Sequence, residues 1–402
     1  MVVANETAPW RVREWLAAIA AFASMFVFAV SANILPAALL RAAPELGMSA
    51  TGLALATSLQ FVCFLVAGIA GGVLGDRVGK KHVLEAGCLL TAMGALAWAA
   101  AGNGVQAWIG AGLIGLGGGV LESQASALLA DLFPRRQKLV MNLSQATFCA
   151  GAIIGTAMMA SLLPGGVSWR MFFGADAGLA VALLALYWAA KTPRGEAQRT
   201  EETPTGNKVP SWSGLYVIAG AMFFYVLAET AVVVYANYHL QIYQGAPEGW
   251  AIRGISLVWG GMLVGRLLCA AMPERAPTGW LVAGLCGASA MTLVWAGSVG
   301  DWHWGIAALA LTGFFFAGTW PMIVVLAAAR YPKRTGTAVG VAAGAGALGA
   351  AVGPLLVTGV LNAGLGANLF QMVAAPTILC GILAAVAGRP RKDGLAPAAG
   401  NR

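Results

Sequence analysis

The fold is decided by a pattern that is clearest in residues 51–101, which read TGLALATSLQFVCFLVAGIAGGVLGDRVGKKHVLEAGCLLTAMGALAWAAA. Two long apolar runs are separated by a short segment that carries Asp76, Arg77, Lys80 and Lys81. A helix of about 20 mainly apolar residues is long enough to cross the roughly 30 Å core of a bilayer. The stretch therefore predicts two membrane-spanning helices joined by a charged turn.

The same pattern continues along the whole chain of 402 residues. Charged residues make up only 10% of the sequence, whereas soluble domains carry about 25%, so the chain cannot cover a water-facing surface. A membrane β-barrel is excluded because its strands would be short and alternating. We predict an all-α integral membrane protein with twelve transmembrane helices, at approximately 15–40, 50–74, 82–101, 105–130, 138–162, 170–190, 212–240, 252–272, 279–298, 303–329, 336–361 and 367–388.

One polar segment divides these spans into two groups of six. Residues 191–210 are rich in charged residues, proline and glycine, which is typical of a linker. The predicted organisation is an N-terminal six-helix half at 1–190, a cytoplasmic linker at 191–210, and a C-terminal six-helix half with a short cytoplasmic tail at 211–402.

The distribution of basic residues predicts the orientation. Of the 24 Lys and Arg residues, 20 fall at the termini, in the linker and in the loops on that same side. Basic residues stay on the cytoplasmic side of a membrane. We therefore expect a multi-pass protein of the cell membrane, most simply a bacterial inner membrane, with both termini in the cytoplasm.

The remaining composition argues against other function classes. The net charge of +8 comes from short clusters between apolar runs, which does not favour nucleic-acid binding. The six cysteines lie in apolar segments without CxxC spacing and are interpreted as small core residues. No nucleophile–base constellation, metal cluster or GxxxxGK(S/T) phosphate-binding loop is recognisable. Residues Gly344 to Gly349 spell GxGxxG, but they lie inside an apolar span and are interpreted as a helix-packing face. We expect no enzymatic activity, no metal and no cofactor.

The charged turn between the second and third spans carries a motif. Its residues are Gly72, Asp76, Arg77, Gly79, Lys80 and Lys81. Their spacing resembles the signature loop G-x-L-x-D-R-x-G-R-R of the major facilitator superfamily, with Lys at the last two positions. Glycines there allow a tight turn and close helix approach. The resemblance implies two six-helix halves and a gating role for this loop.

A narrower resemblance covers most of the chain. Leu121-Glu122-Ser-Gln124, Asn142-Leu-Ser-Gln145, Gly265-Arg266 and Trp320-Pro321 are similar to segments of the fucose–galactose–proton symporter family. An ionisable residue inside a span marks a transport or proton pathway by default. The resemblance implies that Glu122 couples protons; the alternative is a protonated Glu122 that bonds a neighbouring helix. That family has a second carboxylate in the first span, where this chain offers only Asn33 and Pro36.

Glu229 in the seventh span is the other deep carboxylate that we expect to matter. Tyr225 lies four residues before it and so shares its helix face, while Tyr235 and Asn237 follow. Carboxylates and aromatic rings together bind hydroxylated ligands. Helix–helix packing is the alternative for these residues. The complete candidate binding set is Asn33, Gln60, Glu122, Asn142, Gln145, Tyr225, Glu229, Tyr235, Asn237, Trp259, Arg266 and Trp320.

These observations predict a secondary transporter with one central site that works by alternating access. The resemblance implies a sugar or polyol substrate, taken up with protons by a monomer in the lipid bilayer. One alternative is a proton-coupled exporter of drugs or cationic metabolites, because two isolated carboxylates also suit a cation. A different class is a membrane sensor that transports nothing.

Overall fold

The computed structural model describes residues 12–133, 137–191, 213–270, 277–331 and 335–389. In these ranges the regular elements are helical and twelve spans are long and apolar enough to cross a membrane, so the predicted fold class is confirmed. The helices are α1 (Val12–Glu45), α2 (Ala50–Val78), α3 (Lys80–Ala100), α4 (Gly104–Leu132), α5 (Gln137–Leu162), α6 (Trp169–Ala189), α7 (Ser213–Ile242), α8 (Glu248–Ala270), α9 (Thr278–Ser298), α10 (Trp302–Phe316), α11 (Thr319–Arg330), α12 (Thr335–Asn362) and α13 (Leu369–Ala387), with a short 3-10 helix, η2, at Gly366–Asn368.

Several helices are capped at their N-terminus by a polar side chain. Ser49 accepts a hydrogen bond from the backbone N–H of Gly52, and Asn103 accepts one from Gln106. Asp301 does the same for His303. Such caps satisfy backbone N–H groups that have no partner within the helix. Helix starts therefore follow directly from residue type at these positions.

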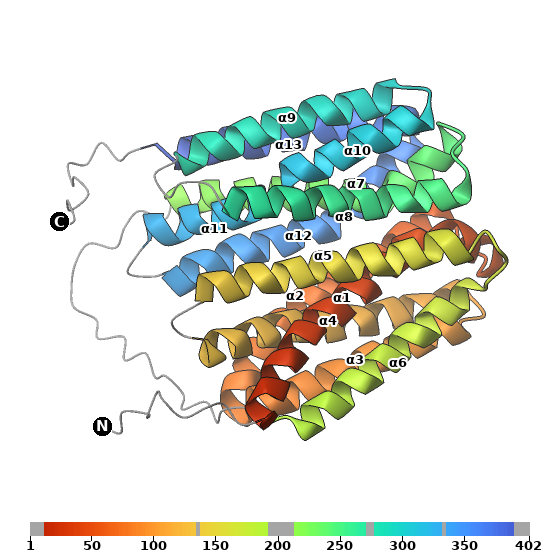
Figure 1. Ribbon diagram of the computed structural model, residues 1–402. Helices are drawn as coiled ribbons and strands as arrows, with labels where there is room; N and C mark the ends of the chain where they lie inside the picture. Colours follow the sequence, from red (N-terminus) through yellow and green to blue (C-terminus); the bar gives the residue numbers. More distant parts are fainter. Residues whose placement is uncertain (1–11, 134–136, 192–212, 271–276, 332–334, 390–402) are drawn as a thin grey trace.

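The helices form two groups of six spans. Helices α1 to α6 make the first group and α7 to α13 the second, and Figure 1 shows them as the lower and upper parts of the bundle. The groups meet where α5 packs against α8, α2 against α12 and α1 against α7. Several charged and amide side chains of the spans, among them Glu122, Glu229 and Arg266, lie at this interface.

The tenth predicted span, 303–329, is correct as a membrane span but wrong as a continuous helix. The structure divides it into α10 and α11, with the break at Ala317 and Gly318. Pro321 lies in the first turn of α11 and lacks the N–H that would bond the carbonyl of Ala317 in an unbroken helix. The loss of that bond explains the break.

Small residues let helices approach closely. A Cβ on Gly261 of α8 would lie 2.1 Å from the carbonyl oxygen of Ala310 in α10, and one on Gly349 of α12 would lie 2.3 Å from that of Phe223 in α7. Gly344 to Gly349 satisfies the spelling of a dinucleotide loop, yet it lies inside α12. Gly346 and Gly349 serve helix packing there, whereas a Cβ on Gly344 would meet nothing within 4 Å.

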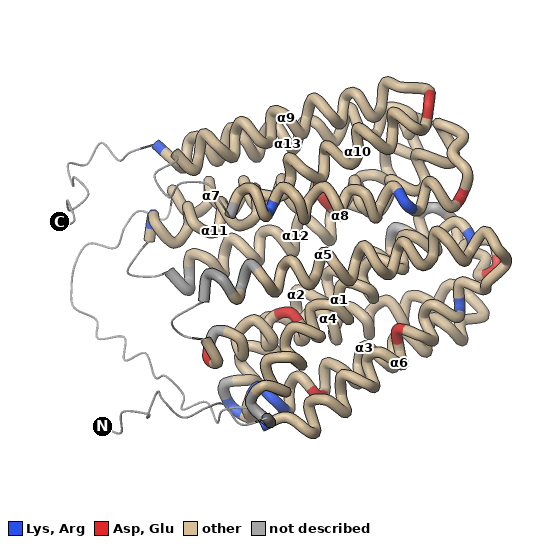
Figure 2. The backbone as a smooth tube through the Cα atoms, viewed as in Figure 1, with Lys and Arg blue, Asp and Glu red and all other residues tan. Residues whose placement is uncertain are grey.

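Charged residues gather at the two ends of the bundle, with a few inside (Figure 2). We call the end that carries Lys80, Lys81 and Arg330 the basic end, and the end that carries Arg41 and Glu248 the opposite end. At the opposite end Arg41 of α1 bonds both carboxylate oxygens of Glu248 in α8, at 2.6 and 2.7 Å. This bidentate ion pair joins the two groups of helices.

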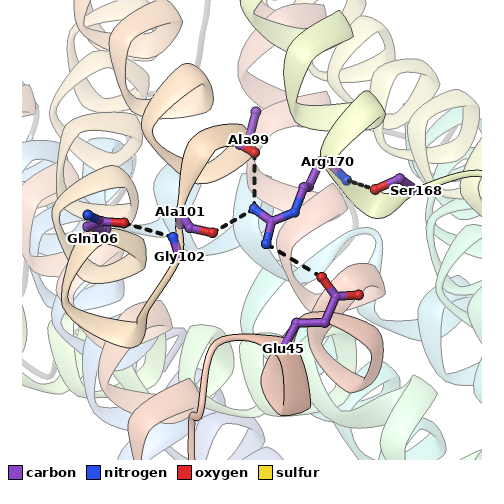
Figure 3. A network of polar contacts seen from close by, with 7 residues as sticks. All are labelled: Glu45, Ala99, Ala101, Gly102, Gln106, Ser168 and Arg170. Atoms are coloured by element: carbon purple, nitrogen blue, oxygen red, sulfur yellow. Dashed lines mark hydrogen bonds and ion pairs between the residues drawn. The ribbon is translucent and has the colours of Figure 1, made fainter.

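A second charged network at the opposite end stays within the first group (Figure 3). Arg170 of α6 donates to the carbonyls of Ala99 and Ala101 at 3.1 and 2.6 Å, where α3 ends, and lies 3.5 Å from the carboxylate of Glu45 in α1. Carbonyls at a helix C-terminus attract cations. Arg170 thus ties α1, α3 and α6 together.

Candidate functional site

Six polar side chains that lie together between the two groups form what we call the central cluster. It consists of Glu122, Gln145, Cys149, Tyr225, Glu229 and Arg266. Glu122 lies ten residues before the end of α4 at Leu132, about 15 Å along the helix axis. Glu229 lies in the middle of α7, which runs from Ser213 to Ile242. Both carboxylates are therefore deep in the bundle.

Arg266 connects the two groups at this level. It belongs to α8, and its Nη1 donates to the carbonyl oxygen of Gln145 at 3.3 Å and to the Cys149 sulfur at 3.1 Å, both in α5. Its guanidinium also interacts electrostatically with Glu229, and Glu122 lies close enough to interact with Arg266 as well. A cation inside a membrane span needs such partners, because an unpaired charge is costly away from water.

The two carboxylates are held differently. The side chain of Gln145 is within hydrogen-bonding range of Glu122, and Glu122 and Glu229 also interact with each other. The Tyr225 hydroxyl lies 3.0 Å from Oε1 of Glu229 and 3.3 Å from the carbonyl oxygen of Phe316, at the end of α10. One hydroxyl proton can be donated to only one of these acceptors at a time. The direction of that hydrogen bond therefore depends on the state of Glu229.

A second polar contact between the groups lies beside the central cluster. The indole Nε1 of Trp259 in α8 donates to Oδ1 of Asn33 in α1 at 2.7 Å, and the Asn33 amide donates to the carbonyl of Ala29. The Trp259 ring lies edge-on to Phe148 of α5, with centroids 5.2 Å apart. Trp259 and Arg266, seven residues apart in α8, both point toward the first group.

Other predicted site residues lie elsewhere. Tyr235 bonds the carbonyl of Pro354 and lies 3.4 Å from the Thr358 hydroxyl, which attaches α7 to α12. Asn237 donates to the carbonyl of Ala37 in α1 and accepts from Gln241. Both line a cavity of about 30 Å³ between α1, α2, α7 and α12, which is room for about one water molecule.

Three more of the predicted binding residues lie on α2, α11 and α5. Gln60 is buried in α2 at 3% exposure. Trp320 faces α12, where a Cβ on Gly346 would lie 3.1 Å from its ring. Asn142 lies in α5, but its side chain is outside the described residues.

The motif between α2 and α3 holds the basic end of the first group together. Gly79 joins the two helices with a φ of +95°, a conformation that glycine adopts readily. Lys80 pairs with Asp131 of α4, and Lys81 donates to the carbonyls of Ala190 and Trp188, at the end of α6.

The other members of the motif do not all behave as their spacing indicates. A Cβ on Gly72 would meet nothing within 4 Å, so packing does not require glycine there, whereas a Cβ on Gly75 would lie 2.1 Å from the Gln124 side chain. Arg77 is exposed, and the Asp76 side chain is outside the described residues.

Sequence reasoning missed two polar residues. Cys149 is not only a small core residue, because it accepts a hydrogen bond from Arg266. Asp176 is a third deep carboxylate, 1% exposed in α6, so the count of two was wrong. A charged residue inside an apolar span was the signal that could have found it.

Comparison with known proteins identifies the family of this two-group membrane bundle. Residues 17–354 match the family model described as Major Facilitator Superfamily. The chain belongs to this superfamily, and it is accordingly a multi-pass membrane transporter and not an enzyme.

The individual relatives match a smaller part of the chain than the family model does. The chain is 30% identical over 158 residues to the multidrug resistance protein MdtH of Yersinia pestis (strain Pestoides F), and 29% identical over 130 residues to MdtH of Shigella dysenteriae serotype 1 (strain Sd197). These matches span 39% and 32% of this chain, and 38% and 32% of the relatives' own length.

Two solved structures share the fold over nearly the whole chain. A D-xylose–proton symporter superposes with a TM-score of 0.78 at 15% identity, covering 92% of this chain and 97% of that one. A bacterial homologue of the human lysosomal transporter Spinster, in an inward-facing and occupied conformation, gives a TM-score of 0.70 at 13% identity, with 94% and 96% coverage. At these identities the likeness is one of fold.

Proposed function

We propose that this transporter takes up a small polar solute, a sugar or polyol, together with protons, by alternating access around the central cluster. The observation that carries the proposal is the position of Arg266, which reaches from one group of helices to the other and lies among two carboxylates. Charged residues inside a membrane protein belong to substrate or proton pathways by default. The fold shared with a D-xylose–proton symporter supports the same choice.

In this proposal Glu122 carries the coupled proton. A carboxylate that loses or gains a proton changes its interaction with Arg266 and Glu229, which belong to the other group of helices. Movement of the two groups relative to each other is then linked to the proton. Gln145, Tyr225, Glu229, Asn33 and Trp259 supply hydrogen-bonding groups and an aromatic face, which are the usual components of a sugar site.

The remaining candidate residues have supporting roles in this proposal. Gln60, Asn142, Tyr235, Asn237 and Trp320 border the solute path, and the motif from Gly72 to Lys81 gates it. The protein acts as a monomer in a bacterial inner membrane, with both termini in the cytoplasm, in line with the positions of its basic residues.

A second function has its own support. The partial match to multidrug resistance proteins and the two carboxylates of the central cluster would suit a proton-coupled exporter of cationic compounds. A cation would take the place of Arg266 as the partner of Glu122 or Glu229, whereas a sugar would bond all three.

Two experiments separate these functions. A thermal-shift screen of the purified protein with D-xylose, other sugars, polyols and organic cations reports binding, because a ligand that binds the folded state raises the melting temperature. Stabilisation by cations alone would contradict the sugar proposal and favour the exporter.

Transport in proteoliposomes with an imposed proton gradient then tests coupling. We expect Glu122→Gln to lose proton-driven accumulation but to keep exchange of labelled solute across the membrane. Glu85→Gln, a carboxylate of α3 outside the central cluster, is the matched control and should accumulate normally. Full accumulation by Glu122→Gln would contradict the assigned role.

A further inference from the structure

Asp176 is a buried carboxyl group that the central cluster does not use. It lies in α6, seven residues after Trp169, and faces α1 on the side away from the second group of helices. Its Oδ2 lies 2.7 Å from the hydroxyl of Ser31 in α1, and its Oδ1 has no hydrogen-bond partner among the described residues. A carboxylate with one neutral protein partner is strongly disfavoured in such a place.

The hydrogen bonds of Ser31 indicate which state Asp176 adopts. The Ser31 hydroxyl lies 3.0 Å from the carbonyl oxygen of Val27 as well as 2.7 Å from Asp176. A serine hydroxyl has one proton and can donate only once. Both short contacts are hydrogen bonds if Ser31 donates to Val27 and a protonated Asp176 donates to Ser31. If Asp176 is ionised, Ser31 must turn to it and abandon Val27.

A second serine in the contact between α1 and α6 has the same two hydrogen bonds, but its partner on α6 is a tyrosine hydroxyl, which keeps its proton at neutral pH. Ser24, seven residues before Ser31, bonds the carbonyl of Ala20 at 2.9 Å and the Tyr187 hydroxyl at 2.7 Å. There the phenol of α6 donates to a serine of α1, whose own proton goes to the carbonyl four residues earlier. In the Ser31 pair, Asp176 takes the place that the Tyr187 phenol has in the Ser24 pair.

No charged side chain near Asp176 offers an alternative partner in the described part of the chain. Helix α6 packs against α3 and α1. Arg41 and Glu45 on α1, Lys80, Lys81, His82 and Glu85 on α3 and Arg170 on α6 lie toward the helix ends, and Cys88 of α3 lies near Tyr187 of α6. The side chains of Arg13 and Glu14 on α1 are outside the described residues.

We propose that Asp176 is a reversible proton-binding site in the interface between α1 and α6, separate from the central cluster. In the conformation described here the carboxyl group holds its proton and donates it to Ser31. On release the proton passes to water, the O–H bond of Asp176 breaks, and the Ser31 hydroxyl rotates from Val27 to the new carboxylate. Atoms and charge balance, since one neutral acid gives one carboxylate and one proton.

The position of Ser31 links this site to the rest of the molecule. Ser31 and Asn33 are two residues apart, about 200° around the helix, so they lie on opposite faces of α1. Asn33 bonds Trp259 of the second group. A change of charge at Asp176 therefore acts on the back of the helix whose front contacts the partner group. This link to transport rests on the proposed function, but the proton site itself does not.

Infrared spectroscopy of the purified protein in lipid tests the site without any solute. The carbonyl stretch of a protonated carboxylic acid is distinct from that of a carboxylate and shifts in heavy water. Because a protonated Glu122 or Glu229 would give a similar band, the Asp176 band is defined as the part that Asp176→Asn removes. We expect it at neutral pH, and we expect it to disappear reversibly in the wild-type protein as the pH is raised while the helical content is kept. Asparagine has the same shape and can still donate to Ser31, so this variant should fold.

Two matched variants sharpen the assignment. Ser31→Ala removes the acceptor and should shift the frequency of the band without abolishing it. Tyr187→Phe removes the hydrogen bond between Tyr187 and Ser24 and should leave the band unchanged. Absence of the band at neutral pH, or a band that persists at every pH up to unfolding, would overturn the proposal. If the band titrates but transport proves independent of protons, the proposed function fails and the site stands.

Discussion

The ion pair between Arg41 and Glu248 allows a quantitative prediction about how the two groups of helices are held together at the opposite end. The bond is bidentate, at 2.6 and 2.7 Å, and joins α1 to α8 across the two groups of helices. In a transporter that alternates between two open states, this contact must break when the opposite end opens. We expect Arg41→Gln to increase the population of molecules that are open at that end.

The size of the shift follows from exposure. Exposed ion pairs contribute about 0.2–1 kcal/mol. The side chain of Glu248 is 18% exposed and that of Arg41 is 51% exposed, and the geometry is bidentate, so the upper end of that range applies. About 1 kcal/mol corresponds to a roughly fivefold change in an equilibrium constant. The effect should shrink at high salt, which screens exposed charges.

Spin labels can measure this population. Gly102 and Gly300 are exposed, lie at the opposite end in different groups, and have room for a side chain, so labelled cysteines there report the separation of the groups. Cys63 and Cys269, the two cysteines that are not fully buried, would be replaced by serine. Glu45→Gln is the matched control, because its ion pair with Arg170 stays within one group.

The outcome is decided by comparison of the three variants. The charge-exchanged double variant Arg41→Glu with Glu248→Arg should restore the wild-type distance distribution. An unchanged distribution in Arg41→Gln, or the same change in Glu45→Gln, would refute the idea that this ion pair holds the groups together.

Three further predictions concern packing, capping and the contact beside the central cluster. Gly261→Ala should destabilise the protein by about 1–3 kcal/mol in a thermal-unfolding assay, because its Cβ would meet backbone atoms of α10, whereas the neighbouring Gly260→Ala, with open space around it, should be neutral. Lys81→Ala should cost about 0.3–1 kcal/mol by the same assay, since it removes the cation at the end of α6; an unchanged melting temperature would show that solvent replaces it fully. Asn33→Ala leaves the Trp259 indole N–H without a partner and should lower the free energy of unfolding by about 1–3 kcal/mol. This loss should exceed the hydrogen-bonding part of the loss in Trp259→Phe, which removes the N–H itself. Equal melting temperatures for Asn33→Ala and wild type would contradict this.

The spans could be predicted because the bilayer imposes one strong constraint on composition. Any helix that crosses it needs a long apolar run, and residues 51–101 show two such runs around a charged turn. The break between α10 and α11 could also be anticipated from Pro321, but only if the proline is weighed against the hydropathy that otherwise continues through it.

The central cluster was predicted in part. Glu122, Gln145, Tyr225, Glu229 and Arg266 are polar residues within apolar runs, which is a local signal. Their meeting point depends on how α4, α5, α7 and α8 pack, which is not local. Tyr235 carries the same signal as Tyr225, yet its hydroxyl bonds α12 because of where it lies around α7.

Tyr235 was predicted for the site and lies elsewhere, whereas Asp176 is a deep polar residue that was not predicted at all. Its signal, an acid inside an apolar span, was as strong as that of Glu229. It lacks nearby polar residues in its own helix, however, and its partner Ser31 lies 145 residues away in the sequence. A serine in an apolar helix is common and gives no indication that it serves a carboxyl group on another helix.

The interrupted tenth span gives the second group of helices a joint. Two short rods, α10 and α11, can change their mutual angle without bending an intact helix, and the carbonyl of Phe316 at the joint is one of two acceptors for the Tyr225 hydroxyl. A rigid-body description of the second group would average over this angle. Probes placed separately on α10 and α11 would distinguish local flexing at the joint from rotation of the whole group.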